Sequence, residues 1–362
     1  MTEQMETVGY DALSVDRLET IIARWRRSRI AVVGDFFLDR YLIIDPELTE
    51  PSLETGLDAY QVVEKRPQPG AAGTVAGNLV GLEMRGVFAV GFTGDDGEGF
   101  ELRQAMDELG LHSDGVVTAR EMMTPTYTKP LVREEDGSLR ELNRLDIRNR
   151  RPIPTEIEDE IIERVRWLAG EAAITIISDQ EDDPELGVVT PRVVDALAEI
   201  GQEYPDGIWV DSRGDISRFR NCIIKPNASE ACRAAGVELD GEPTLEQARQ
   251  AGERLLEQTN SWTVVVTVGG QGVVVVTDEA QPFHVPAVRV EGEIDIVGAG
   301  DSFTAGMAST LAIRGTSLDE AAIVGNLVAS ITIQQIGTTG TASPEQVLQR
   351  LEDVHAGRMP GA

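Results

Sequence analysis

Residues 30–35 read Ile30-Ala31-Val32-Val33-Gly34-Asp35, a short apolar run that ends at a turn. Such a run is typical of a strand that is buried on both faces. It follows residues 14–27, where apolar side chains recur at helical spacing. The same combination of apolar run and turn recurs at residues 87–91, 174–179, 208–211 and 264–270.

Helical patterns separate these strands. They occupy residues 100–109, 155–169, 190–200 and 244–258. Short buried strands that alternate with amphipathic helices predict an α/β fold of three layers, α/β/α, with a mainly parallel central sheet. In such sheets, ligands bind at the carboxyl ends of the strands.

Two segments break this alternation. Residues 41–66 and 124–146 show β-type alternation without a helical period, and Glu135-Asp136-Gly137-Ser138 has the composition of a hairpin turn. We expect both segments to leave the main sheet as a small β-strand lid. The expected organisation is an N-terminal helical extension at 1–28, one domain with its lid at 29–351, and a C-terminal tail at 352–362.

The charge of the chain excludes several classes of protein. The 362 residues include 62 acidic and 32 basic side chains, which gives a net charge of −30. This charge repels nucleic acid and anionic membranes, and no basic stripe offsets it. The three lysines, Lys65, Lys129 and Lys225, do not follow a glycine, so no P-loop is present. The surplus of acid, with arginine favoured over lysine, is compatible with a high-salt cytoplasm.

Other kinds of site and location find no support in the sequence. Two cysteines provide no disulfide framework, and three scattered histidines provide no metal or triad motif. No apolar run approaches the roughly 20 residues of a membrane span, and no signal pattern opens the chain. We expect a cytoplasmic protein that binds neither nucleic acid nor membranes.

The sharpest local feature lies at residues 295–303, Asp-Ile-Val-Gly-Ala-Gly-Asp-Ser-Phe, which precede a helical pattern. Small residues before a helix let backbone N–H groups converge, and the helix dipole adds positive potential there. We expect Gly298, Ala299 and Gly300 to form an anion hole with Asp301 beside it as a base. The alternative is a tight turn in which Asp301 only caps the helix.

A base beside an anion hole suits phosphoryl transfer to an alcohol. Gly269 and Gly272 follow a strand, so the backbone of a nucleotide could approach closely there. Asn227 and Glu230, three residues apart, suit phosphate and hydrated Mg²⁺. Each signal is weak alone, because a glycine-rich turn is usually only a turn and such a polar pair is usually a solvated helix start.

The order of these motifs resembles that of the ribokinase (PfkB) family of carbohydrate kinases, over residues 29–351. Within that family, the chain is similar to the sugar-phosphate kinases that act on heptose 7-phosphate for ADP-heptose synthesis. The motifs that carry the resemblance are Gly34-Asp35 with Asp39-Arg40-Tyr41, Pro69-Gly70-Ala71-Ala72, Val90-Gly91 with Gly94-Asp95-Asp96, Arg144-Leu145-Asp146, Val210-Asp211, Lys225-Pro226-Asn227 with Glu230, Thr267 with Gly269 and Gly272, Gly298 to Asp301, and Gly337-Thr338.

The resemblance implies a ribokinase-like fold and an ATP-dependent, Mg²⁺-requiring kinase that phosphorylates a hydroxyl of a sugar or sugar phosphate. Asp301 would be the base, and the backbone of residues 298–300 the anion hole. The lid would close over the sugar and pair two subunits into a homodimer. The remaining assignments are Asn227, Glu230, Thr267, Gly269, Gly272 and Asn326 at ATP, Glu230 at Mg²⁺ through water, Asp295 at a monovalent cation such as K⁺, and Asp39, Gly70, Ala71 and Thr74 at the sugar.

Five departures from the family pattern concern the acceptor and the cation. Arg213 stands where the heptose-phosphate kinases often have a lysine, which keeps the charge but changes its geometry. Ala71 stands where a glycine is usual, and Thr74 where an asparagine binds sugar; a hydroxyl replaces one amide hydrogen bond but not two. Ile296 stands where a small or hydroxyl residue is usual. Residues 180–185, Gln-Glu-Asp-Asp-Pro-Glu, replace a Gly-Lys-Gly type of turn. They are either an exposed acidic loop or a poor neighbour for a phosphorylated sugar.

Two alternatives to a sugar kinase stay open: a kinase for nucleosides or other small alcohols, and a catalytically silent protein that binds a sugar or nucleotide. A dinucleotide-dependent oxidoreductase is disfavoured, because Gly34-Asp35-Phe36-Phe37 puts aromatic side chains where a pyrophosphate needs bare backbone. Relatives that make ADP-heptose often carry a nucleotidyl-transferring domain. About eleven residues follow Leu351, so we expect any such activity on another chain.

Overall fold

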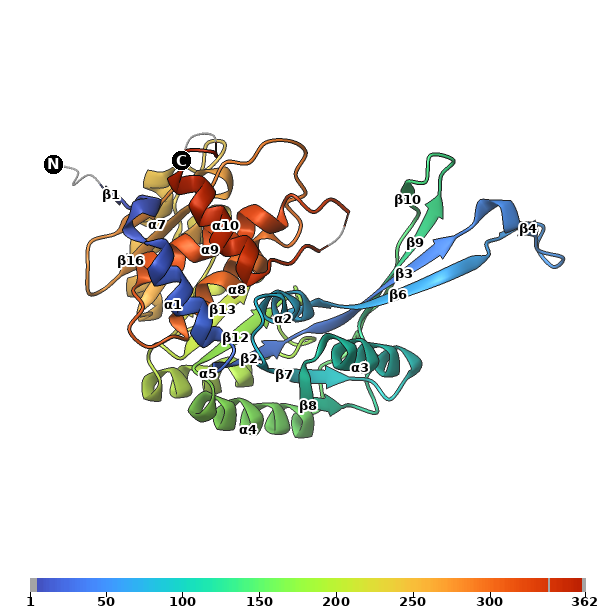
Figure 1. Cartoon of the computed structure of the whole chain (residues 1–362). Coiled ribbons are helices and arrows are strands. Elements are labelled where there is room, and N and C mark those ends of the chain that lie inside the picture. The colour runs from blue at the N-terminus through green and yellow to red at the C-terminus, as the bar shows by residue number, and fades with distance from the viewer. Residues whose placement is uncertain (1–4, 338, 360–362) are drawn as a thin grey trace.

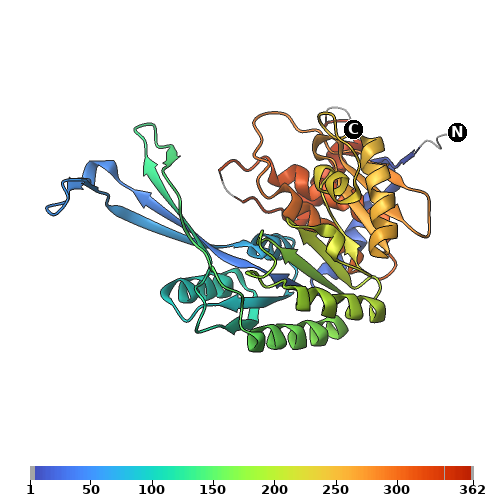
Figure 2. The same cartoon turned by 180° about the vertical axis from the view of Figure 1, so that it is seen from behind.

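A ten-stranded sheet runs through the body of the protein and has helices on both faces (Figures 1 and 2). The computed structural model describes residues 5–337 and 339–359. All strands of this sheet are parallel except β16, which confirms the predicted mainly parallel sheet. In spatial order, the strands are β1 (Glu6–Thr7), β17 (Phe283–Val285), β16 (Val273–Thr277), β15 (Thr263–Thr267), β14 (Ile223–Ile224), β13 (Ile208–Ser212), β12 (Ile174–Asp179), β2 (Arg29–Gly34), β7 (Gly86–Thr93) and β8 (His112–Thr118).

The two faces of the sheet belong to two hydrophobic cores. In β2, Ile30 and Val32 join one core and Ala31 and Val33 the other, because successive side chains of a strand point to opposite faces. Helices α1 (Val15–Trp25), α2 (Ala72–Gly81), α3 (Gly97–Leu109), α8 (Ala299–Leu311), α9 (Leu318–Thr332) and α10 (Pro344–His355) pack into the first core. Helices α4 (Thr155–Glu171), α5 (Pro191–Glu203), α6 (Ala228–Ala235) and α7 (Leu245–Thr259) pack into the second. The predicted three-layer α/β/α arrangement is therefore confirmed.

The N-terminal segment packs closely on the body of the protein. Leu18, Ile21 and Trp25 of α1 are fully buried in the first core. The hydroxyl of Tyr10 donates a hydrogen bond of 2.8 Å to the carbonyl of Pro286. The described part of the expected N-terminal extension therefore shares a core with α8, α9 and α10. No described helix has the length and apolar character that crossing a membrane requires.

A second sheet projects from the body as the expected lid (Figures 1 and 2). β9 and β10 pair in antiparallel fashion with Leu139 opposite Arg133, which confirms the predicted hairpin turn between them. The lid begins earlier than residue 41, because β3 follows β2 almost directly. Its strands are β3 (Phe36–Ile44), β6 (Val62–Ala71), β9 (Thr126–Arg133), β10 (Leu139–Glu141) and β11 (Leu145–Ile147), with a small hairpin of β4 (Glu50–Pro51) and β5 (Asp58–Ala59).

Four 3₁₀ turns complete the secondary structure of the described residues. They are η1 (Tyr10–Ala12), η2 (Pro46–Leu48), η3 (Ile216–Arg218) and η4 (Gly269–Gln271).

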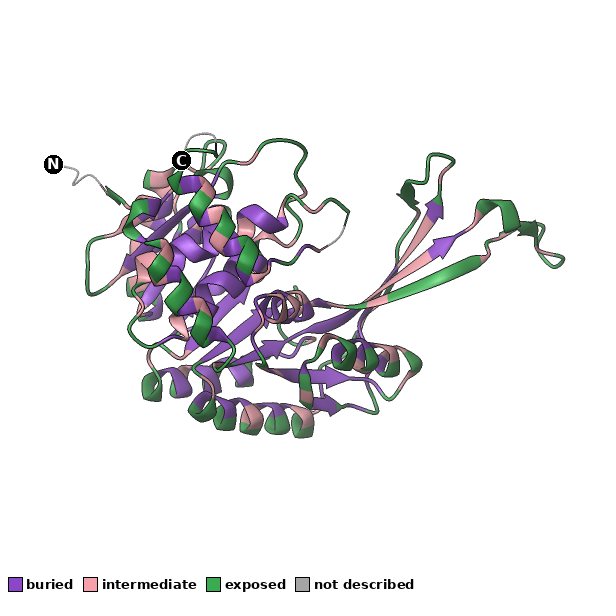
Figure 3. Cartoon of the chain, in the orientation of Figure 1, coloured by how far each residue is buried: buried purple, intermediate pink, exposed green. Residues whose placement is uncertain are grey.

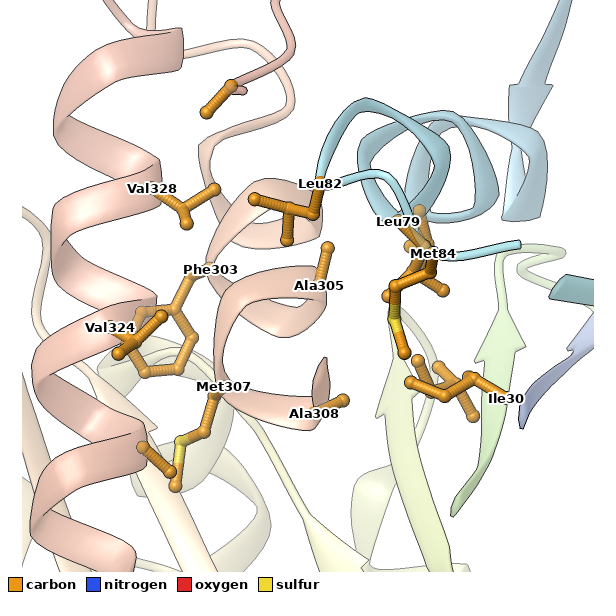
Figure 4. Packing of buried hydrophobic residues seen from close by; sticks show 14 of the residues in the cluster. Ile30, Leu79, Leu82, Met84, Phe303, Ala305, Met307, Ala308, Val324 and Val328 are labelled. Carbon is orange, nitrogen blue, oxygen red and sulfur yellow. The ribbon is translucent and has the colours of Figure 1, made fainter. Parts of the chain in front are cut away.

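Close packing fixes helix α8 between α9 and α2 (Figure 4). Phe303 of α8 packs beside Val324 of α9 in the first core. The approach of α8 and α9 depends on glycine, since a Cβ at Gly306 would lie 2.9 Å from Cγ2 of Val328. A side chain at Gly325 would likewise clash with the Phe303 ring. The N-terminus of α8 therefore has a fixed position relative to the sheet.

Candidate active site

Asp301 lies in the first turn of α8, beside backbone amides that face away from the helix. Gly298 is the N-cap, with a left-handed φ of 79°, so Asp301 is not the cap and that alternative is wrong. The amide of Ala299, expected in the anion hole, instead donates to the carbonyl of Ile296 (3.1 Å). The amides of Gly300 and Asp301 have no backbone partner among the described residues. These two N–H groups and the positive end of the helix dipole can bind an anion.

A buried ion pair lies next to this helix end. Nζ of Lys225 is 2.9 Å from Oδ2 of Asp211, and both side chains are buried. The Thr304 hydroxyl, one turn along α8 from Asp301, donates a long hydrogen bond of 3.4 Å to the same Asp211 oxygen. Burial and the charge of Asp211 raise the pKa of Asp301 to about 7, against the opposing effect of Lys225 and Arg213. A carboxylate with such a pKa suits a base that works near neutral pH.

The parallel sheet brings these charged groups together. Asp211 is the second-last residue of β13 and Lys225 follows β14, the adjacent strand, so both residues lie at the carboxyl edge of the sheet. The Lys225 amide also donates to the carbonyl of Val210 (2.8 Å). Sequence reasoning placed Asp211 and Lys225 in motifs of the resemblance without giving them a role, and it named Arg213 only as a departure from the family pattern. The available signal was their position directly after two apolar runs of neighbouring strands.

Asn227 and Glu230 form a reciprocal capping box at the start of α6. The Glu230 amide donates to Oδ1 of Asn227 (2.9 Å), and the Asn227 amide donates to Oε2 of Glu230 (2.8 Å). The box leaves the side-chain nitrogen Nδ2 of Asn227 and Oε1 of Glu230 free of partners among the described residues. Burial raises the pKa of Glu230, while the Asn227 amide and Lys225 act in the opposite direction. Asn227 and Glu230 can therefore cap the helix and still offer polar atoms to a ligand.

The glycine-rich turn after β15 has one open side and one packed side. Thr267 forms a parallel bridge to Asn227, which places the turn beside α6. Gly269 has a φ of 51° and no atoms near its missing side chain. A Cβ at Gly272 would lie 2.1 Å from the carbonyl of Val285. The turn is therefore open toward solvent at Gly269 and closed against β17 at Gly272.

The side chain of Asn326, expected at the ATP site, supports the chain behind that turn. Its amide donates to the carbonyls of Val285 (3.2 Å) and Pro286 (3.0 Å). Asn326 and Gly272 thus both lie against the segment of Val285 and Pro286.

The residues expected at the sugar lie at the base of the lid. Oδ2 of Asp39 is 3.2 Å from Nζ of Lys129, whereas its Oδ1 is buried with no hydrogen-bond partner among the described residues. Burial raises the pKa of Asp39, and Lys129 opposes this. A Cβ at Gly70 would lie 2.8 Å from the Asp39 carboxyl group, so the glycine gives this side chain its room. Ala71 has φ 54° and ψ −116°, an unfavourable conformation for any residue except glycine.

Thr74, which was expected at the sugar, lies close to Gly298 of the expected anion hole. A Cβ at Gly298 would lie 3.7 Å from Cγ2 of Thr74 and 3.1 Å from Cγ2 of Thr339. The structure therefore brings α2, the first turn of α8 and the loop after α9 together at one point.

Asp295 joins two loops beside the anion hole. Its carboxylate accepts hydrogen bonds from the amides of Val297 (3.0 Å) and Gly337 (3.3 Å). Its own amide donates to Ile333 (2.8 Å). Within the described ranges, no group of three or more His, Cys, Asp or Glu side chains could hold a metal on its own. A divalent cation here would need water and phosphate among its ligands, which is the usual arrangement for Mg²⁺.

Comparison with known structures supports a ribokinase-like fold. Arabidopsis thaliana ribokinase complexed with ribose and ATP superimposes with a TM-score of 0.63 at 21% identity, covering 90% of this chain and 99% of that one. Phosphofructokinase-2 of Escherichia coli in complex with potassium has a TM-score of 0.66 at 19% identity, covering 91% of this chain and 99% of that one.

The sequence also has curated relatives. Bifunctional protein HldE of Pelobacter propionicus is 28% identical over 341 residues, which cover 94% of this chain and 66% of that protein. HldE of Wolinella succinogenes is 29% identical over 339 residues, which cover 93% of this chain and 67% of that protein. The chain thus spans about two thirds of the length of these relatives. The profile of the pfkB family carbohydrate kinases matches residues 41–346. The expected resemblance is confirmed: this protein belongs to the pfkB family of carbohydrate kinases.

Proposed function

We propose that this protein transfers the γ-phosphoryl group of ATP to a hydroxyl of a sugar or sugar phosphate, with Asp301 as the catalytic base. The observation that carries the proposal is the position of Asp301 beside the open amides of α8, with a pKa of about 7. The carboxylate takes the hydroxyl proton while the hydroxyl oxygen bonds to the γ-phosphorus. The bond from phosphorus to the oxygen bridging the β and γ positions breaks, and ADP leaves with that electron pair.

The anion hole stabilises the transferring group. The amides of Gly300 and Asp301 supply hydrogen bonds, and the helix dipole adds positive potential. Lys225 lies close by, since a Cβ at Gly300 would be 3.5 Å from its Nζ. Gly298 and Ala299 provide the turn that exposes these amides. Negative charge that develops on the γ-phosphoryl oxygens therefore meets fixed positive groups.

ATP would lie across the carboxyl edge of the sheet, from Gly269 to the anion hole. Thr267, Gly269 and Gly272 would border the nucleotide, with Asn326 supporting the wall, and Asn227 would bind phosphate. Glu230 would hold Mg²⁺ through water. Mg²⁺ bound in this way neutralises phosphate charge. Asp295 and its two loops would hold a monovalent cation such as K⁺, by analogy with the potassium complex of the Escherichia coli enzyme.

We also propose that two copies pair through their lids. Val62 and Val63 of β6 are 43% and 46% exposed. β6 is an edge strand of the lid sheet, and its first five residues are exposed (Figure 3), so these apolar side chains are available to a second copy. Sedimentation velocity should find a dimer that Val63→Glu weakens, and a monomer at all concentrations would contradict the proposal.

A turnover assay tests the kinase function. Wild-type protein with ATP and Mg²⁺ is offered sugars, sugar phosphates, nucleosides and other small alcohols, and ADP release is measured. We expect turnover with a sugar or sugar phosphate. Turnover with nucleosides alone would favour that alternative class, and ligand binding without turnover would favour a silent binding protein.

A further inference from the structure

Three cationic side chains lie around Asp39 and Tyr127 at the base of the lid. Tyr127 lies opposite Asp39 in the pairing of β9 with β3. Arg144 stacks on the Tyr127 ring, with Cζ 4.1 Å from the ring centre, and Arg148 donates a hydrogen bond of 2.5 Å to the Tyr127 hydroxyl. Lys129 is two residues along β9. These positive charges lie where the acceptor would meet the lid.

Each of the three cations already has a carboxylate partner. Lys129 pairs with Asp39 at 3.2 Å. Arg144 makes two parallel contacts with Asp146, at 2.7 and 2.8 Å. Arg148 lies 3.5 Å from Glu181. We call these residues the lid-base cluster: Asp39, Lys129, Arg144, Asp146, Arg148 and Glu181. Its three positive and three negative side chains balance.

Glu181 is built into this cluster and does not belong to a freely exposed acidic loop. Its side chain is only 12% exposed. Its backbone amide donates to Oδ2 of the buried Asp35 at 3.1 Å, and so does the amide of Gln180 at 2.9 Å. On the other side of the loop, the Val188 amide donates to Oδ1 of Asp35 at 2.7 Å. The Asp35 carboxylate therefore anchors both ends of the loop and holds Glu181 against Arg148.

This charge balance discriminates between acceptors. A phosphate monoester carries about −1.5 to −2 charges at neutral pH. At the lid-base cluster it would either displace a carboxylate that the fold holds in place or remain without a positive partner. Oδ1 of Asp39, a buried acceptor atom of the cluster without a partner among the described residues, requires an O–H or N–H donor instead.

We propose that the acceptor binds at the lid-base cluster as an uncharged polyhydroxy compound, so that the protein selects free sugars over their phosphate monoesters. This inference rests on the proposed kinase function and narrows its acceptor class. Glu181 acts as the specificity-determining residue, because its carboxylate pairs with Arg148, the arginine that a phosphate would otherwise bind.

Calorimetric titration tests the inference without requiring turnover. Wild-type protein, saturated with Mg²⁺ and a non-hydrolysable ATP analogue, is titrated with matched pairs: ribose and ribose 5-phosphate, fructose and fructose 6-phosphate, mannose and mannose 6-phosphate. We expect at least one free sugar to bind at least about tenfold more tightly than its phosphate. The phosphate group would lie beside carboxylates without a positive partner, and a tenfold difference corresponds to about 1.4 kcal/mol. Tighter binding of the phosphates, or no binding of any free sugar, would overturn the inference.

Two variants of the same loop locate the effect. Glu181→Gln frees Arg148 and should improve binding of the sugar phosphates relative to the free sugars by about tenfold. Glu185→Gln makes the same change of charge at an exposed position and should leave that ratio unchanged. Equal ratios in wild type and Glu181→Gln would overturn the role of Glu181. Free-sugar binding without ADP release in the turnover assay would instead contradict the kinase function and leave the charge selectivity supported.

Discussion

The ammonium group of Lys225 lies 2.9 Å from the carboxylate of Asp211, at the carboxyl edge of two adjacent strands. The pair places one positive and one negative charge beside Asp301, on elements other than the helix that carries it. The proposed base and the groups that control its charge are therefore held by different parts of the fold. This separation allows each contribution to be tested by itself.

Removing Lys225 alone should destabilise the fold. Lys225→Met leaves Asp211 buried without its partner, and breaking a buried pair costs about 3–5 kcal/mol. The double variant with Asp211→Asn should recover at least half of the loss, because no unpaired charge remains. Urea unfolding of both single variants and the double variant provides the comparison. Strictly additive losses would contradict a coupled pair.

The activity of the wild type should fall below neutral pH. Asp301 accepts a proton only as a carboxylate, so kcat/KM should rise with pH through the pKa of about 7 and then level off. The measurement is kcat/KM from pH 5 to 9 with ATP and Mg²⁺ saturating. A profile that is flat down to pH 5 would contradict the raised pKa.

Asp211→Asn should move this rise to lower pH. Removal of the neighbouring negative charge lowers the pKa of Asp301, by on the order of one unit for a nearby charge. Thr304→Val is the matched control, since it removes a contact to Asp211 without changing any charge. Its profile should keep the wild-type midpoint. A merely structural role of Asp211 would lower the rate at every pH without moving the midpoint.

Ala71→Gly should stabilise the protein. The φ of 54° and ψ of −116° at Ala71 cost about 1–3 kcal/mol for a residue with a Cβ, and glycine relieves much of this strain. The glycine gain is partly offset by the entropy of the unfolded chain, so we expect a net gain of about 1 kcal/mol. Ala76→Gly, inside α2, should instead lose about 1 kcal/mol. Equal losses for both variants in urea unfolding would contradict the strain at Ala71.

The sequence was sufficient for the layers of the fold. The run from Ile30 to Val33 and its repeats predicted the buried strands, because apolar runs of that length suit little else. It missed β14, since the two residues Ile223 and Ile224 are too short to show a period. The lid was predicted from alternation, although its start was placed too late, at residue 41.

The candidate site was predictable where it lies within one local segment. The residues around Asp301 were found because a helix start and its preceding turn are contiguous in sequence. The pair of Lys225 with Asp211 depends on which strands are neighbours, and the contact of Arg148 with Glu181 depends on how a loop meets the lid. Neither sequence spacing nor composition contains that information. Asn326 is a different case. The sequence predicted a residue at ATP, whereas the structure shows that its side-chain amide supports the backbone of Val285.

Replacing the Asp301 carboxylate tests whether this residue is the catalytic base. Asp301→Asn keeps the size of the side chain but cannot accept the hydroxyl proton. We expect kcat to fall about 10²- to 10⁴-fold at pH 8. The Kd for ATP, measured by calorimetric titration, should stay within a factor of about three of wild type. A kcat close to that of wild type would contradict the assignment of Asp301 as the base.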